Sequence, residues 1–590
     1  MEERPKMLEK VDLKAKKLTK EEYKPVHDEL VGKLVLLQQE ARSKGVGLVV
    51  LVEGWPGAGK GSRISELVYE LDARATKVHV TEDVDVKAAK NFAGAKWDVT
   101  GVNPLMKQFW ESLGERGEIT FYDRGWYTSA AEQVLFGLVQ KQPKELKKLA
   151  KKMKKLPEGE RAAVAARSAL AGDVIGSYQQ VALNFEQMLV NDGYAVVKLF
   201  VHVSKKAQKK RLDALRKNPD TAWRVSKRKM ELTKYYNDGY KVYDRLLDGS
   251  DFDFAPWTIV NGEDRRAANI QIAEALVNAL ENALSAGPDA AAEEAKAKAA
   301  ENSEALADAA EGTASGKKKK STKAAQKAAE KEAAAQSALA PRESAYMVMA
   351  GYPQIDHSVE KPRIDEPEEY RSLLDKEQDR FRKLQEEAFQ KRVPLMIMYE
   401  GWDAAGKGGN IKRIAQAIDA RAYQIFPSPA PSKTELAHPH LWRYWTRLPQ
   451  AGKVGIYDRS WYGRVLVERV EGFASPDQWG RAYDEINAFE HELVQWGAVL
   501  LKFWVDITPD EQLARFEARA ADPAKTWKLT DEDWRNRDKY PLYKAAVDDM
   551  FRLTSTEFAP WTVLESDSKF YARIQALKAI NEALEARLHC

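Results

Sequence analysis

The stretch that decides the fold is EGWDAAGKGG, residues 400–409. It fits the spacing GxxxxGK and follows a short apolar run over 395–399, which predicts a buried strand; a helix is predicted directly after it. Small residues let successive backbone N–H groups face one anion, the N-terminus of the helix adds its dipole, and the lysine supplies a mobile positive charge. The stretch therefore predicts a loop that binds phosphate.

Nearly the same text occurs earlier in the chain, where residues 53–61 read EGWPGAGKG. Other pairs repeat in the same order, among them 122–124 with 457–459 and 255–257 with 559–561. A chain of 590 residues is longer than one hydrophobic core usually grows. The repeat therefore predicts two domains of one fold.

Each copy alternates helical and strand-like segments. An amphipathic helix, over 22–43 or 369–391, precedes the strand that leads into the glycine loop. Strands spaced by helices imply a parallel sheet covered on both faces, so we expect an α/β protein with two tandem P-loop kinase-like domains. The predicted strands are 46–52, 118–122, 195–203 and 257–260 in the first copy, and 395–399, 454–457, 498–507 and 561–564 in the second.

Composition places a linker between the copies. The stretch 286–345 consists mostly of Ala, Glu, Lys and Ser with almost no large apolar residue, so it cannot bury a core of its own. Its lysine run, 317–320, is expected to be a solvated tract. The expected organisation is a first domain over 1–285, a linker over 286–345 and a second domain over 346–590.

Charge and cysteine usage narrow the class of protein. The net charge is only +4, from 93 basic and 89 acidic residues, so an anionic partner has to be argued from local clusters. The single cysteine, Cys590, excludes a disulfide within the chain, and no apolar run approaches the length of a membrane span. We expect a cytoplasmic protein without a membrane partner. The eight histidines show no zinc-site spacing.

The loop lacks one common feature. Gly408 stands where P-loops usually have the Ser or Thr whose hydroxyl binds Mg²⁺. Asp403, inside the loop, and Asp458, at the end of a predicted strand, carry hard oxygen ligands suited to this ion. We expect both to hold Mg²⁺, with Mn²⁺ as a substitute. The alternatives are a turn-stabilising role for Asp403 and a simple ion pair for Asp458.

Many basic residues follow the loop in the second copy. Each alone is more often a surface charge, but beside a P-loop they together indicate a polyanionic substrate. They are Lys412, Arg413, Lys433, Arg443, Arg447, Arg459, Arg464, Arg469, Arg515, Arg519, Lys525 and Lys528.

With these motifs, the second copy closely resembles the family-2 polyphosphate kinases. The resemblance runs from about residue 365 to the C-terminus and rests on 400–409, 441–443 (LWR), 458–472 (DRSWYGRVLVERVEG) and 559–561. A weaker resemblance covers about 21–275. The resemblance of the second copy implies that polyphosphate and a nucleotide meet over the P-loop beneath a helical lid, 511–538. The fused two-domain arrangement implies phosphorylation of AMP to ADP.

The resemblance also implies roles for individual residues. Asp403 would orient the acceptor phosphate and, with Asp458, bind the metal, and Lys407 would hold the transferring phosphates. Arg459 and Arg464 would stabilise the moving phosphoryl group. The residues expected to bind the two substrates are Gly401, Ala404, Ala405, Gly406, Gly408, Gly409, Lys412, Lys433, Arg443, Arg469, Arg515, Arg519, Lys525 and Lys528.

The first copy departs from this pattern, so we expect it to be a degenerate domain that packs or regulates. It keeps Lys60, Asp123, Arg124 and Arg211 and could still bind an anion. Its replacements are Pro56 for Asp403, Gln108 for Arg443, Gly125 for Ser460, Ser129 for Arg464, Val134 for Arg469, Leu215 for Arg519 and Thr221 for Lys525.

The favoured function is in-line transfer of a phosphoryl group from inorganic polyphosphate to AMP, without a covalent enzyme intermediate. One alternative is a polyphosphate kinase acting on ADP or other nucleotides. Another is an ATP-dependent nucleoside monophosphate kinase, against which Gly408 and the excess of cations count. A third is a non-catalytic polyanion-binding or storage protein. The expected partners are polyphosphate and AMP or ADP; no nucleic-acid partner is expected, and a homo-oligomer is left open.

Overall fold

The computed structural model describes residues 6–81, 103–128, 130–132, 135, 174–286, 346–523 and 531–589. They divide into two compact units. Unit 1 consists chiefly of the described residues between 6 and 286, and unit 2 chiefly of those between 346 and 589. Apart from Ala286, which ends a helix, the linker expected over 286–345 lies outside the described residues and stays a prediction.

Each unit is built on a five-stranded sheet in which every strand pair is parallel. The order is β2-β3-β1-β4-β5 in unit 1 and, read from the equivalent edge, β7-β8-β6-β9-β10 in unit 2. The strands are β1 Gly47–Gly54, β2 Thr76–Val80, β3 Ile119–Asp123, β4 Tyr194–His202, β5 Trp257–Asn261, β6 Leu395–Gly401, β7 Tyr423–Pro427, β8 Val454–Asp458, β9 Val499–Asp506 and β10 Trp561–Glu565.

The expected α/β fold with two tandem parallel sheets is confirmed, and the eight predicted strands lie within three residues of their predicted ends. The sequence missed the edge strands β2 and β7. Both are five residues long, and most of their side chains are exposed or only partly buried. They therefore lack the continuous apolar run that marks a strand buried on both faces.

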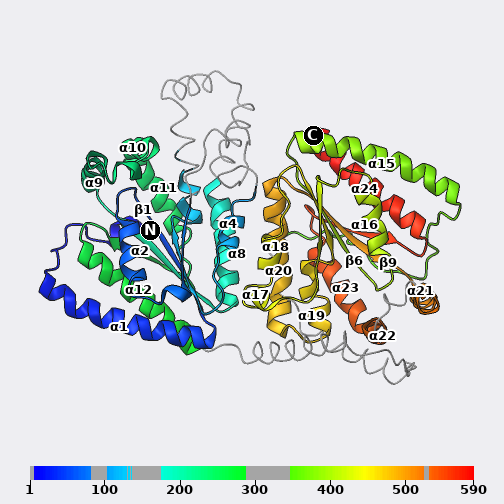
Figure 1. The fold of residues 1–590 in the computed structure, drawn as a ribbon, viewed down its shortest axis with the longest axis horizontal. Helices are drawn as coiled ribbons and strands as arrows, with labels where there is room; N and C mark the ends of the chain where they lie inside the picture. Colours follow the sequence, from blue (N-terminus) through cyan, green and yellow to red (C-terminus); the bar gives the residue numbers. More distant parts are fainter. Residues whose placement is uncertain are drawn as a thin grey trace, which may run out of the picture. The chain divides into compact units, whose positions relative to one another are not determined.

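Long helices cover the sheets. In unit 1, α1 Lys20–Lys44 packs beside α12 Arg265–Ala286, and in unit 2, α15 Pro367–Gln390 packs beside α24 Lys569–His589 (Figure 1). The other α-helices in the described part of unit 1 are α2 Lys60–Val68, α4 Lys107–Glu111, α8 Val174–Asn191, α9 Lys205–Lys217, α10 Lys227–Lys234 and α11 Tyr236–Asp248. Those of unit 2 are α16 Lys407–Ala415, α17 Lys433–Leu436, α18 Trp442–Trp445, α19 Val467–Val470, α20 Pro476–Trp496, α21 Pro509–Ala521, α22 Asp531–Asp538 and α23 Tyr540–Thr554. Short 3₁₀ helices are η1 Met7–Lys10, η2 Ala73–Ala75, η3 Ala222–Arg224 and η4 Trp461–Arg464.

A fully buried ion pair ties β9 to α20. Lys502 Nζ lies 2.8 Å from Glu490 Oε2 and also donates to the Thr554 carbonyl at 2.6 Å. Glu490 accepts further bonds from the Trp461 indole at 2.9 Å and the Tyr462 hydroxyl at 2.7 Å. Because Trp461 and Tyr462 begin η4, two residues after the end of β8, the pair also fixes the turn that follows that strand.

Unit 1 has the same pair. Lys198 Nζ lies 2.8 Å from Glu186 Oε2, both side chains are fully buried, and Trp126 and Tyr127 donate to Glu186. Taking a charge out of water is costly unless the partner and hydrogen bonds are present, and here they are. The duplicated network is therefore part of the frame common to both units.

We predict that Lys502→Met destabilises unit 2 by about 3–5 kcal/mol, because it leaves the Glu490 carboxylate buried without its partner. Urea unfolding followed by circular dichroism measures this loss. The double variant Lys502→Met with Glu490→Gln should recover much of it, since no charge is then left buried. A single variant as stable as the unchanged protein would contradict this reading.

Candidate active site

The P-loop of unit 2 joins β6 to α16, and its first glycine is required by close packing. Gly401 has a φ of 146°, and a Cβ there would lie 2.3 Å from the Val505 carbonyl oxygen of β9. Gly406 and Ala404 also have positive φ values, 112° and 62°. The loop therefore wraps tightly over the carboxyl end of the sheet and leads into the N-terminus of α16.

Lys407 lies over this loop. Its Nζ donates to the carbonyls of Gly401 at 2.7 Å and Trp402 at 3.1 Å. Burial lowers the pKa of Lys407, and the carboxylates of Asp403 and Asp458 both act in the opposite direction. The two aspartates expected to share a metal are therefore both close enough to the same ammonium group to stabilise its charge.

Asp403 is held by residues from two other elements. Its Oδ1 accepts from Arg459 at 3.3 Å and its Oδ2 accepts from the Asn536 amide of α22 at 2.9 Å. Burial alone would raise the pKa of Asp403, but attraction to Lys407 and Arg459 and the Asn536 hydrogen bond outweigh it, and the net pKa is lowered. The carboxylate is therefore ionised at neutral pH. These partners lie outside the loop, unlike those of a turn-stabilising aspartate.

Asp458 ends β8, the strand next to β6. No residue in the described part of the chain donates a hydrogen bond to its carboxylate. Arg459, which follows it, has a φ of 62° and donates its backbone N–H to the Tyr399 carbonyl at 3.0 Å. A Cβ at Gly408 would meet no heavy atom within 4 Å, so the place of the missing P-loop hydroxyl is open space. The structure thus brings Asp403, Lys407, Asp458 and Arg459 together.

Glu400 fixes the turn that carries Asp458 and Arg459. It is buried, and its Oε1 accepts from the Ser460 backbone N–H and hydroxyl, both at 2.7 Å. In unit 1 the equivalent Glu53 accepts from the backbone N–H groups of Gly125 and Thr128, each at 3.0 Å. Sequence reasoning quoted Glu400 without giving it a role, although its repetition in both copies was the available signal.

Arg515, expected to touch substrate, is instead bound to the loop. Its Nη1 donates to the carbonyls of Ala404 at 3.0 Å and Ala405 at 2.8 Å, and its side chain is 6% exposed. In unit 1, Arg211 donates to the carbonyls of Ala58 at 3.2 Å and Gly262 at 2.7 Å. Both arginines therefore brace the P-loop, which explains why the first copy keeps Arg211.

Two other expected substrate ligands lie in buried ion pairs. Arg443 faces Glu435 at 3.3 Å and donates to the Pro429 carbonyl at 3.0 Å. Arg469 donates to Asp549 at 2.9 Å and to the Tyr483 hydroxyl at 2.7 Å, and it is 2% exposed. Part of each guanidinium is therefore used inside the unit, while Nε of both side chains is buried without a hydrogen-bond partner. The substrate contact expected from the sequence stays a prediction.

The remaining predicted residues are spread over several elements. Arg464 ends η4 and faces Glu468 at 3.2 Å, and Arg519 lies half-buried on α21. Lys412 on α16 and Lys433 on α17 are exposed. Lys525 and Lys528 of the expected lid lie outside the described residues, as do Ser129 and Val134 of the first copy.

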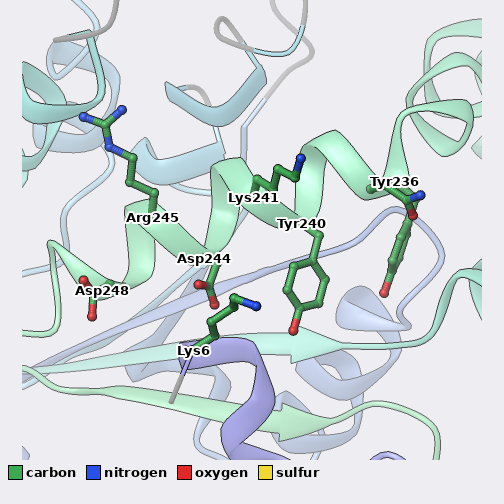
Figure 2. Close-up of a pocket in the computed structure, with 8 residues that line it drawn as sticks. Lys6, Tyr236, Tyr240, Lys241, Asp244, Arg245 and Asp248 are labelled. Carbon is green, nitrogen blue, oxygen red and sulfur yellow. The ribbon is translucent and has the colours of Figure 1, made fainter. Parts of the chain in front are cut away.

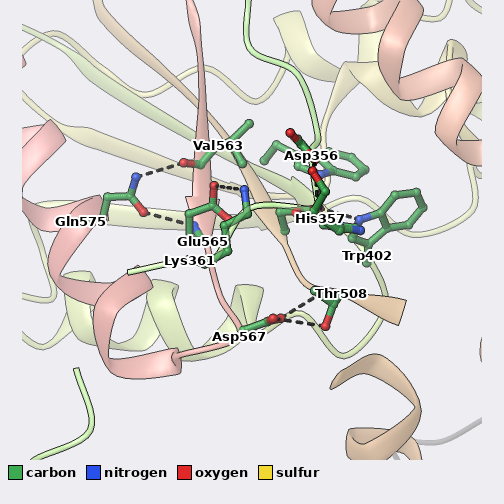
Figure 3. Close-up of polar contacts among 12 residues, drawn as sticks. Asp356, His357, Lys361, Trp402, Thr508, Val563, Glu565, Asp567 and Gln575 are labelled. Atoms are coloured by element: carbon green, nitrogen blue, oxygen red, sulfur yellow. Dashed lines mark hydrogen bonds and ion pairs between the residues drawn. The ribbon is translucent and has the colours of Figure 1, made fainter. Parts of the chain in front are cut away.

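A buried carboxylate missed by the sequence positions the loop tryptophan. Asp506, the last residue of β9, accepts from the indole N–H groups of Trp402 at 2.8 Å and Trp504 at 3.3 Å, and His357 Nε2 lies 2.8 Å away (Figure 3). In unit 1, Trp55 donates instead to His202 Nδ1 at 2.8 Å, and burial lowers the pKa of His202 to about 4.

Unit 1 repeats the loop without the acid inside it. Lys60 Nζ donates to the carbonyls of Gly54 at 2.9 Å and Trp55 at 3.3 Å, as Lys407 does in unit 2. Asp123 ends β3, and Arg124, which follows it, shares the positive φ of Arg459, at 65°. Pro56 supplies no carboxylate at the position of Asp403.

A separate cavity of about 630 Å³ lies beside α11 of unit 1 (Figure 2). Its lining mixes Lys6, Lys241 and Arg245 with Asp244 and Asp248. Mixed charges do not match a site for a polyanion. In the part of the chain that is described, no three or more His, Cys, Asp or Glu residues form a metal-holding group, and no helix is long and apolar enough to cross a membrane.

The parallel sheet, the glycine loop at its carboxyl edge, and a lysine flanked by carboxylates and an arginine define a P-loop phosphotransferase. The profile of the polyphosphate kinase 2 family matches residues 17–166, 173–287 and 364–589. The chain therefore belongs to this family, and both copies lie within the matched regions.

Named relatives match nearly the whole chain. A polyphosphate:AMP phosphotransferase from Pseudomonas syringae pv. tomato is 32% identical over 546 residues, which cover 91% of this chain and 90% of the relative. One from Pseudomonas aeruginosa is also 32% identical, over 558 residues, with 93% and 92% covered. A crystal structure described as a polyphosphate kinase 2 from Pseudomonas aeruginosa superimposes with a TM-score of 0.69 at 28% identity, over 97% of this chain and 98% of that one.

We predict that the contact between His357 and Asp506 makes stability depend on pH. The hydrogen bond to Asp506 raises the pKa of His357 despite partial burial, with Lys361 acting against the charge and Asp567 for it. A raised folded pKa means that this stabilisation is complete below the unfolded histidine pKa and is lost as pH rises through the folded value. Between pH 6 and pH 9 the unchanged protein should lose about 1 kcal/mol more stability than His357→Gln.

Thermal or urea unfolding of both proteins across this pH range measures the difference. His589→Gln is a suitable control, because His589 lies 3.4 Å from Glu387 and its side chain is 59% exposed. Parallel pH profiles for the unchanged protein and His357→Gln would contradict the assignment.

Proposed function

We propose that this chain transfers the terminal phosphoryl group of inorganic polyphosphate to AMP, forming ADP, and that unit 2 carries the reaction. The observation that carries the proposal is the placement of Lys407 at the P-loop beside the carboxylates of Asp403 and Asp458 and the guanidinium of Arg459. The names of the two relatives that match more than nine-tenths of the chain support AMP as acceptor.

The metal in this proposal is Mg²⁺, with Mn²⁺ as a substitute. Asp403 and Asp458 fit such an ion, because both are carboxylates near one phosphate-binding lysine and Gly408 offers no hydroxyl. Two protein carboxylates suffice when phosphate oxygens and water supply the other ligands, as Mg²⁺ prefers. When bound, the ion neutralises charge that develops on the phosphoryl oxygens.

The residues of the site then have distinct tasks. A phosphate oxygen of AMP attacks the terminal phosphorus of polyphosphate, and the bond from that phosphorus to the bridging oxygen breaks, so the donor chain leaves one unit shorter. Lys407 binds the phosphates in the loop, and Asp403 orients the acceptor phosphate. Arg459, whose side chain is 52% exposed, can reach the moving group and stabilise its charge.

Unit 1 has a different task in this proposal. It keeps the loop lysine, the strand-end aspartate and the bracing arginine, but Pro56 removes the carboxylate that orients the acceptor. We assign residues 1–285 to a degenerate domain, 286–345 to a linker and 346–590 to the catalytic domain. Arg515 is assigned to loop support.

The donor assay tests the proposed function. With AMP and Mg²⁺, we expect ADP to form with polyphosphate as donor, in proportion to the phosphate removed from the chain. Chromatographic separation of AMP, ADP and ATP measures the product. ADP formed only with ATP would favour a nucleoside monophosphate kinase, and binding of polyphosphate without turnover would favour a storage protein; either result would overturn the proposal.

The two loop lysines provide a matched comparison. Lys407→Ala should lower kcat/KM by at least about 10²-fold, since it removes a positive charge that faces the transferring phosphates. Lys60→Ala removes the same contacts from unit 1 and should leave most of the activity. Steady-state rates with polyphosphate and AMP measure both. Equal losses would contradict the assignment of catalysis to unit 2.

A further inference from the structure

Two basic residues on α24 lie beside the P-loop helix and have no place in the site described so far. Lys569 is the first residue of α24, and Arg573 follows one turn later on the same side. Arg573 Nη2 lies 3.1 Å from the position that a Cβ at Gly409 would take, so its guanidinium covers the first turn of α16. Gly409 leaves the room that this contact needs.

Aromatic residues fix the guanidinium of Arg573 in this place. Its Nη1 donates to the Tyr370 hydroxyl of α15 at 3.4 Å, and the group lies 5.9 Å from the Tyr370 ring and 6.0 Å from the Phe570 ring. Tyr370 and Phe570 are themselves stacked, with 4.1 Å between ring centroids. Neutral partners hold the side chain without neutralising its charge.

Lys569 and Arg573 form a cluster with an excess of positive charge. Burial lowers the pKa of Lys569, and the neighbouring charges of Arg515, Arg573 and Arg519 lower it further. Glu511 acts in the opposite direction, but it already pairs with Arg515 at 2.6 Å. Within the described residues, Lys569 and Arg573 form no ion pair. Like charges held together in this way favour binding of an anion.

At the equivalent positions of unit 1, a carboxylate pairs with the basic side chains. By their spacing from the repeated motifs, Arg265, Asn269 and Glu66 correspond to Lys569, Arg573 and Arg413. The Glu66 carboxylate pairs with Arg265 and with Arg63 at 2.9 Å, and it accepts from Asn269 at 2.7 Å. A carboxylate thus pairs with the cations at this place in unit 1, whereas in the described residues of unit 2 none pairs with Lys569 or Arg573.

We propose that Lys569 and Arg573 form a subsite for the phosphate groups of polyphosphate that adjoin the phosphate held at Lys407. The subsite borders Gly409, two residues beyond Lys407, so a chain bound in the loop continues directly onto it. Repeated cations suit a donor that repeats its charge along the chain, whereas AMP has a single phosphate. This inference rests on the proposed function.

The test is the double variant Lys569→Gln with Arg573→Gln. Its KM for polyphosphate should rise at least about tenfold, because two charge-assisted contacts to phosphate are lost. The KM for AMP should stay unchanged. Lys578→Gln is the control: Lys578 lies on the same helix and is exposed, and this variant removes one positive charge where the double variant removes two, so both KM values should stay as they were.

A second variant guards against misfolding, since Arg573 also packs on Tyr370. Arg413→Glu gives unit 2 the carboxylate that neutralises this place in unit 1, and it should also raise the KM for polyphosphate selectively. An unchanged KM for polyphosphate in folded variants, or a raised KM for AMP in its place, would overturn the subsite. If the unsubstituted protein shows no turnover with polyphosphate, the proposed function itself is rejected.

Discussion

The site depends on a single lysine ammonium held over a tight glycine loop beside two carboxylates. Lys407 can occupy this position because Gly401 lets β6 and β9 approach closely and because β6 lies between β8 and β9 in the sheet. That strand order brings Asp403 in the loop and Asp458 at the end of β8 to one edge. The lysine charge lowers the pKa of Asp403 despite its burial, and so keeps an ionised oxygen ligand available at neutral pH.

Comparison of the two units distinguishes the residues that stabilise the fold from the residues that face phosphate. Both keep the buried Lys–Glu pair, the glutamate that caps the strand-end turn, and the arginine that braces the loop, because each satisfies buried polar groups that the fold itself creates. Only unit 2 has the loop aspartate, and among the described residues the cations Lys569 and Arg573 of its α24 form no ion pair. Duplication therefore preserved the structural network in both copies, while the groups that face phosphate differ.

The sequence predicted the fold well but did not show the partners of the arginines inside unit 2. The repeated loop, the tandem organisation and four strands of each sheet could be read from motif spacing and apolar runs. Arg469 and Arg515 resembled phosphate ligands, but partners such as Asp549 for Arg469 and Ala404 for Arg515 lie far away in the chain. Lys569 and Arg573 carried no sequence signal, because only the packing of α24 beside α16 brings them to the loop.

The most direct test of the central claim is the anomalous scattering of Mn²⁺ in crystals of the full chain soaked with polyphosphate. The account predicts a manganese peak within coordination distance of the carboxylates of Asp403 and Asp458 in unit 2 and none beside Pro56 and Asp123 in unit 1. Peaks at both loops, or a metal in unit 2 that touches neither aspartate, would contradict it.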